Sequence, residues 1–80
     1  MAKRVGRGKM LRHDLDKLIL EMECENGVPQ TANYEADASE TDDELVAGDT
    51  VVFLVLEVPV GGNPGVAINV VKLPAENSCM

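Results

Sequence analysis

The sequence is poor in aromatic residues. Tyr34 and Phe53 are the only two rings, and tryptophan is absent. Large rings supply much of the buried area in small cores. A chain of 80 residues that is 45% hydrophobic must therefore build its core mainly from Val, Leu, Ile, Ala and Met. We expect a thin core, which favours completion by a partner protein or by a second copy of the chain.

Long apolar runs and cysteines are also scarce. No run approaches the roughly 18 apolar residues of a membrane span, and the basic start lacks the apolar stretch of a signal peptide. We therefore expect no membrane partner. The two cysteines, Cys24 and Cys79, allow at most one internal bridge. Because Cys79 lies near the chain end, where chains fray, we expect free thiols and a cytoplasmic protein, in the host cytoplasm if it is viral.

Basic residues are missing from position 18 to position 71. Residues 1–17 hold six of the seven Lys and Arg, although the whole chain has a net charge of −7. This split predicts a flexible basic arm (residues 1–14), a single small β-rich domain (15–74) and a frayed tail (75–80). Such an arm is typical of non-specific nucleic-acid contact or of docking on a neighbouring subunit. Its candidate contact residues are Lys3, Arg4, Arg7, Lys9 and Arg12.

Residues 50–58, TVVFLVLEV, are the clearest strand of the sequence. They are β-branched and apolar, and Pro59 follows them; residues 66–73, VAINVVKL, read as the partner strand. Both faces of residues 50–58 are apolar, so both need cover. We expect the second cover to be the N-terminal segment folded back as a helix, or another subunit.

Residues 10–24 fit either a helix or a strand. As a strand, residues 18–24 alternate, and residues 28–36 alternate after Asn26-Gly27. As a helix, six apolar residues have amphipathic spacing: Met10, Leu11, Leu15, Leu18, Ile19 and Met22. A two-residue loop would set the apolar side of one strand against the polar side of the other. We therefore predict a hairpin with a three-residue loop, residues 25–27, which pairs Cys24 with Val28, Leu20 with Ala32 and Leu18 with Tyr34.

These patterns predict a mainly β fold. We expect a small antiparallel sheet or a partly open barrel of four or five strands, with one short helix. The alternative is an α+β fold in which an N-terminal helix covers the sheet. The short helix is placed at residues 41–48, where Thr41 and Glu44 form a T-x-x-E capping box and Gly48 suits a helix end.

No catalytic or metal motif fits. The segment VGRGKM has neither the spacing nor the Ser/Thr of a phosphate-binding loop. A calcium loop starting at Asp37 or at Asp42 would lack the glycine at position six and the glutamate at position twelve. The only histidine, His13, lies beside Asp14 in the predicted arm. We therefore expect a protein that is not an enzyme and carries no cofactor or metal.

The carboxylates remain as candidate binding groups. The capping box accounts for some acids of residues 37–49, and the others suggest a face for a basic partner. We expect a non-enzymatic protein-binding or accessory module, a small viral or bacterial regulator or inhibitor, that forms homo-oligomers and acts through an acidic face and an apolar sheet surface. The alternatives are a nucleic-acid-associated protein and a structural subunit whose basic arm contacts the acidic body of its neighbour. The predicted partner-binding residues are Glu21, Glu23, Glu35, Asp37, Glu40, Asp42, Asp43 and Asp49.

Overall fold

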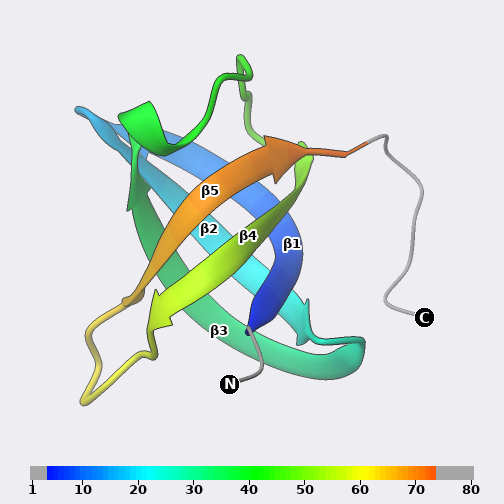
Figure 1. Ribbon diagram of the computed structural model, residues 1–80. Helices are drawn as coiled ribbons and strands as arrows, with labels where there is room; N and C mark the ends of the chain where they lie inside the picture. The colour runs from blue at the N-terminus through cyan, green and yellow to red at the C-terminus, as the bar shows by residue number, and fades with distance from the viewer. Residues whose placement is uncertain (1–3, 74–80) are drawn as a thin grey trace.

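The computed structural model describes residues 4–73, which form five strands and one short helix (Figure 1). The fold is mainly β, as predicted. The elements are β1 (Val5–Asp14), β2 (Lys17–Glu25), β3 (Val28–Asp37), the 3₁₀-helix η1 (Ala38–Glu40), β4 (Thr50–Glu57) and β5 (Gly65–Lys72).

The strands close into a barrel in the order β1-β2-β3-β5-β4. Every neighbouring pair is antiparallel except β3 and β5, which run parallel and pair only at Tyr34↔Gly65 and Glu35↔Val66. The predicted partly open, antiparallel arrangement is therefore corrected to a closed barrel with one short parallel seam. A five-stranded Greek-key barrel with this strand order is an OB-type barrel.

β1 replaces the predicted flexible arm over residues 5–14. It pairs with β2 on one side and with β4 on the other, so it joins the two halves of the barrel. Gly6 and Gly8 permit this, because a Cβ at Gly8 would overlap the carbonyl oxygen of Glu21, and one at Gly6 would meet the Phe53 ring. The alternative N-terminal helix is wrong as well, since residues 10–14 lie in β1.

The β2–β3 hairpin forms, but through a different turn from the one predicted. Asn26 and Gly27 make a two-residue loop with φ of 50° and 82°, and Glu25 pairs with Val28. A register shift between Met22 and Cys24 then moves the pairing by one residue. This bulge brings the apolar sides of both strands to the interior, which the sequence argument had assigned to a longer loop.

The core fills the barrel and is closed at one end by a loop. Tyr34 and Phe53 lie in it with ring centroids 5.4 Å apart. Leu45, in the loop of residues 41–49 (the closing loop), is only 3% exposed and packs into the same cluster. The buried members are Met10, Leu18, Leu20, Met22, Tyr34, Ala36, Leu45, Val51, Phe53, Ala67 and Val70.

β4 has one covered face and one that is covered only in part. Val51 and Phe53 point into the core, whereas Val52 and Leu54 are half-buried. Leu56 and Val58 are exposed at 58% and 40%. No helix packs on this outer face within residues 4–73, so the expected helical cover is wrong.

The predicted helix at residues 41–48 is absent. The Thr41 hydroxyl accepts a hydrogen bond from the backbone N–H of Asp43, which makes a tight turn instead of a cap. The only helix of the described chain is η1, and the closing loop that follows it is held by side chains. Glu40 accepts from the N–H of Asn69 at 3.0 Å, and Asp43 accepts from the N–H of Lys72 at 2.9 Å. These two carboxylates cover the part of the β5 edge that β3 does not reach.

Candidate binding groove

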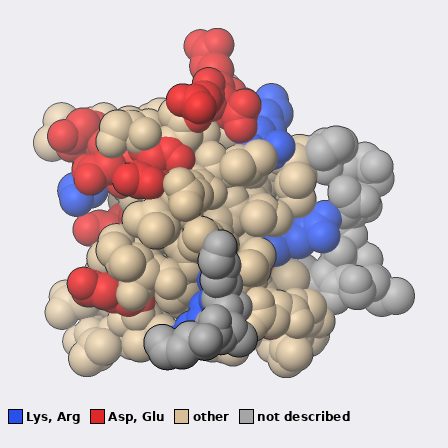
Figure 2. All heavy atoms as spheres, viewed as in Figure 1, with Lys and Arg blue, Asp and Glu red and all other residues tan. Residues whose placement is uncertain are grey.

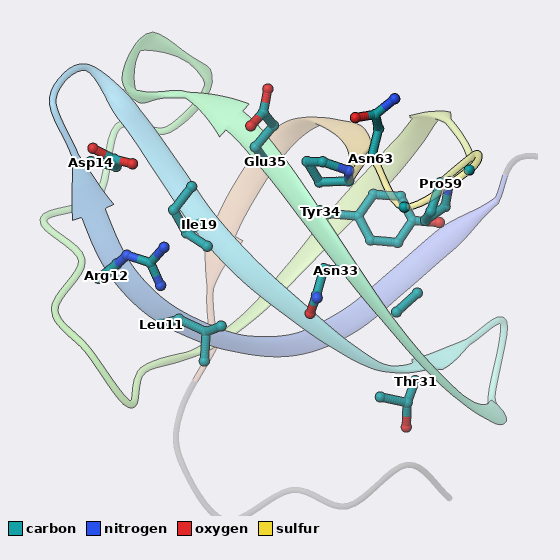
Figure 3. Close-up of a pocket in the computed structure, with 14 residues that line it drawn as sticks. Leu11, Arg12, Asp14, Ile19, Thr31, Asn33, Tyr34, Glu35, Pro59 and Asn63 are labelled. Atoms are coloured by element: carbon teal, nitrogen blue, oxygen red, sulfur yellow. The ribbon is translucent and has the colours of Figure 1, made fainter.

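An open groove of about 620 Å³ crosses the outer side of the barrel over the ends of several strands (Figure 3). In the close-up, Arg12, Asp14 and Ile19 lie on one side of β3, and Pro59 and Asn63 lie on the other. The lining residues come from β1, β2, β3 and the loop between β4 and β5: Leu11, Arg12, Asp14, Ile19, Thr31, Ala32, Asn33, Tyr34, Glu35, Pro59, Gly61, Gly62, Asn63 and Pro64.

Strand alternation builds the β2–β3 side of the groove. Leu18 and Leu20 on β2 point into the core, so Ile19 between them points outward. On β3 the same alternation buries Tyr34 and leaves Asn33 exposed. A register shift between Met10 and Arg12 displaces Leu11 from the regular pattern of β1. The result is an apolar floor with polar groups around it.

The β4–β5 loop (residues 58–64) forms the opposite wall. Its tight turn runs from Val60 to Asn63, whose N–H donates to the Val60 carbonyl at 3.0 Å. The two central residues, Gly61 and Gly62, have φ of 59° and 88°, which a side chain would oppose. The conformation of the wall is thus defined by its own turn.

Tyr34 lies at the base of this wall. It is 1% exposed, its hydroxyl has no hydrogen-bond partner among the described residues, and its ring packs where a Cβ of Gly65 would stand. Burial raises the pKa of the phenol above its ordinary value, and the nearby Glu25 carboxylate raises it further. The ring therefore serves the core as a neutral group.

Charge around the groove is mixed, with more acid than base. Arg12, Asp14 and Glu35 line it. The Lys17 ammonium lies 3.8 Å from a Glu35 carboxylate oxygen and 3.9 Å from one of Asp37, and all three groups are partly exposed. Such exposed pairs add little stability, so these side chains can change partners at small cost.

The predicted acidic residues fall into two groups. Three of them bind the chain itself: Glu40 and Asp43 hold β5, and Asp49 accepts from the Val46 N–H and lies 3.6 Å from the Lys72 ammonium. Glu21 and Glu35 lie on the outer side of β2 and β3. In the view of Figure 2, most carboxylates gather in the upper half, where η1 and the closing loop lie.

Within residues 4–73, the other three predicted acids make no side-chain hydrogen bond to the backbone. Asp37 ends β3 and lies near Lys17, Glu23 is exposed opposite the bulge of β3, and Asp42 is exposed in the closing loop. Glu40, Asp43 and Asp49 thus have a folding role, which the sequence argument had assigned to a helix cap or left open. Of the predicted acids, only Glu35 lines the groove, and Asp14 of β1 lines it as well.

The predicted basic residues do not form one patch. Arg4 donates to both carboxylate oxygens of Glu25, at 2.6 and 2.9 Å, and this hydrogen bonding raises the pKa of its guanidinium. Arg7 is half-buried, whereas Lys9 and Arg12 are exposed on β1. Lys3 lies outside the described residues. Of the five, only Arg12 lines the groove.

The remaining candidates for chemistry have structural roles. The Nε2–H of His13 donates to the carbonyl of Leu45 at 3.1 Å, which helps to hold the closing loop. Cys24 is buried and disulfide-bonded, which corrects the expected free thiol and removes its support for a reducing compartment. Cys79 lies outside the described residues.

Within residues 4–73, no three or more His, Cys, Asp or Glu side chains are grouped so as to hold a metal ion. No helix in the same range is both long and apolar enough to cross a membrane.

Comparison with protein-family models, with curated proteins and with solved structures finds no match to this chain. The groove is therefore interpreted from its own residues. Sequence reasoning missed Thr31, Asn33 and the wall of residues 58–64, which it treated as an ordinary strand and connecting loop. The usable signals were the Gly-Gly pair before Asn63-Pro64 and the polar outward positions of β3.

Proposed function

We propose that this protein is a non-enzymatic binding module that holds a segment of a partner protein in the groove. The observation that carries the proposal is the groove itself: an apolar floor at Leu11 and Ile19, polar groups beside it and a preformed wall at Gly61–Pro64. Apolar floors with a few fixed polar groups are typical of recognition sites. A fold of OB type does not by itself show what is bound.

The nucleic-acid alternative has less support. Single strands bind by stacking bases on exposed rings along a positively charged path. Here the chain has no Trp, and its single Tyr and single Phe, Tyr34 and Phe53, are buried in the core. Arg4 is engaged with Glu25, and Arg12 in the groove has Asp14 and Glu35 as neighbours in the lining. Protein binding is the better match to this surface.

The test is affinity capture from a lysate of the source organism, with three forms of the full-length protein. Asn33→Arg places a bulky charge at an exposed position in the groove. Val71→Arg, the matched control, places the same charge at an exposed position on β5, outside the groove. We expect a protein that is retained by the wild type and by Val71→Arg and lost with Asn33→Arg. Equal retention by all three forms, or retention of nucleic acid instead of protein, would overturn the proposal.

A further inference from the structure

The groove ends on a strand edge that is paired on one side only. β3 pairs with β2 along its length, from Lys17↔Asp37 to Glu25↔Val28. On its other side it meets β5 only at Tyr34 and Glu35. Residues 28–33 therefore have no strand on this side within the described part of the chain. We call this stretch the free edge of β3.

The local sequence explains why the β3–β5 pairing stops there. Pro64 precedes Gly65, the first paired residue of β5, and it has no N–H to continue the ladder. Before Pro64 the chain turns back through Val60–Asn63. Thr31–Asn33 and Gly61–Pro64 both line the groove, so the groove lies at the point where the ladder ends.

The edge of β5 beyond its short pairing with β3 is covered by side chains. Beyond Val66, the N–H groups of Asn69 and Lys72 on β5 bind the carboxylates of Glu40 and Asp43. Within residues 4–73 no side chain makes a corresponding hydrogen bond to the free edge of β3. An unpaired edge presents backbone donors and acceptors in the spacing of a strand, and an extended peptide satisfies them by adding to the sheet.

Charge selects the class of peptide. The six free-edge residues, VPQTAN, are uncharged, whereas β2 and β3 together carry five carboxylates and one ammonium group. Arg4 holds one of the carboxylates, Glu25, and Lys17 is shared between Glu35 and Asp37. Glu21 pairs with Asn33 in the ladder, and Asp14 and Glu35 line the groove together with Arg12, so the surface beside the free edge is acidic on balance and complements a basic strand.

We propose that an extended, basic segment of a partner protein adds as a strand to the free edge of β3. This inference rests on the proposed function of the groove as a protein-binding site. The backbone of the segment pairs with residues 28–33, and its side chains enter the groove between β3 and the wall of the β4–β5 loop. Backbone pairing supplies affinity, and the acidic surroundings select the charge.

The experiment selects binders from a random library of ten-residue peptides on the full-length protein. The selected peptides are then resynthesised with N-methyl groups at alternate residues, which removes backbone donors and keeps the side chains. We expect peptides of net positive charge whose affinity falls about 100-fold on N-methylation, as the loss of about three backbone hydrogen bonds would produce. In the complex, amide hydrogen exchange is expected to slow at those residues of 28–33 whose N–H points away from β2; Pro29 has no amide hydrogen.

The outcomes separate this inference from the proposed function. Suppose that the selected peptides lose affinity for Asn33→Arg but bind the wild type equally well when they are N-methylated. This result would support the groove as a protein-binding site and overturn strand addition. Selected peptides of neutral or negative charge would overturn the basic partner. If no peptide is selected, or if Asn33→Arg binds the selected peptides as well as Val71→Arg does, the groove is not a protein-binding site and both proposals fall.

Discussion

Replacing Leu45 by alanine should destabilise this protein far more than its position in a loop suggests. The side chain is 3% exposed and fills one end of the barrel, whereas the neighbouring Val46 is 59% exposed. Burying a leucine is worth about 1.5–3 kcal/mol, and core Leu→Ala changes cost about 2–5 kcal/mol when the cavity persists. Because the closing loop can partly relax into the space, we expect a loss of about 2.5 kcal/mol for Leu45→Ala.

That loss is a large share of the total stability. A domain of 80 residues is expected to have a free energy of unfolding of roughly 4–12 kcal/mol. The Tm should fall by about 10–20 °C, and the urea midpoint by about 2.5 M, because m is near 1 kcal/mol/M for a small protein. Urea unfolding followed by far-ultraviolet circular dichroism measures it. Val46→Ala is the matched control, with an expected loss below about 0.5 kcal/mol. If the two variants lose the same stability, Leu45 does not close the barrel.

Two further predictions follow from the interior. Gly8→Ala should lower the free energy of unfolding by at least about 3 kcal/mol or prevent folding, because the new Cβ would overlap the backbone of Glu21. Lys9→Ala, at the exposed neighbouring position, is the control and should change the stability in urea little. A Gly8→Ala protein as stable as Lys9→Ala would contradict the close β1–β2 approach. Burial raises the pKa of Tyr34 in the folded state above the ordinary value of 10.0. The neutral phenol therefore stabilises the fold fully below pH 10.0, and this stability is lost as the pH rises through the folded pKa. Because Tyr34 is the only tyrosine and no tryptophan is present, the phenolate absorbance in an alkaline titration reports it alone, and a midpoint at or below that of a short tyrosine peptide would refute its burial.

The sequence predicted the strands better than their connections. The apolar run of residues 50–58 and the alternation around Asn26-Gly27 identified β4 and the β2–β3 hairpin, because alternation follows directly from which face is buried. The predicted turn was wrong because a bulge at Gln30 and Thr31 of β3, opposite Glu23, shifts the register without a local sequence signal. Residues 5–14 were assigned to an arm because they are basic, but strand pairing on both sides outweighs charge, and Gly6 and Gly8 were the signal for close packing.

The groove was harder to predict from the sequence than the strands. Its residues come from β1, β2, β3 and the β4–β5 loop, and only the closure of the barrel brings them together. Glu21 and Glu35 were chosen for their charge, and the structure places them on the outer side of β2 and β3. Glu40 and Asp43 were chosen for the same reason, yet they bind backbone N–H groups about 29 residues away, a pairing that depends on the barrel topology.

The two carboxylates that bind β5, those of Glu40 and Asp43, also affect whether copies of this protein could pair with one another. If the edges of β3 and β5 were both uncovered beyond their short parallel pairing, the β3 edge of one copy could pair with the β5 edge of the next. Such a contact joins unlike surfaces, so it repeats without closing and builds a filament. Glu40 and Asp43 bind the N–H groups of the β5 edge, so this edge is not available to pair with the β3 edge of another copy. If the proposed strand addition to β3 is right, η1 and the closing loop cover the edge through which a second copy would otherwise continue the sheet.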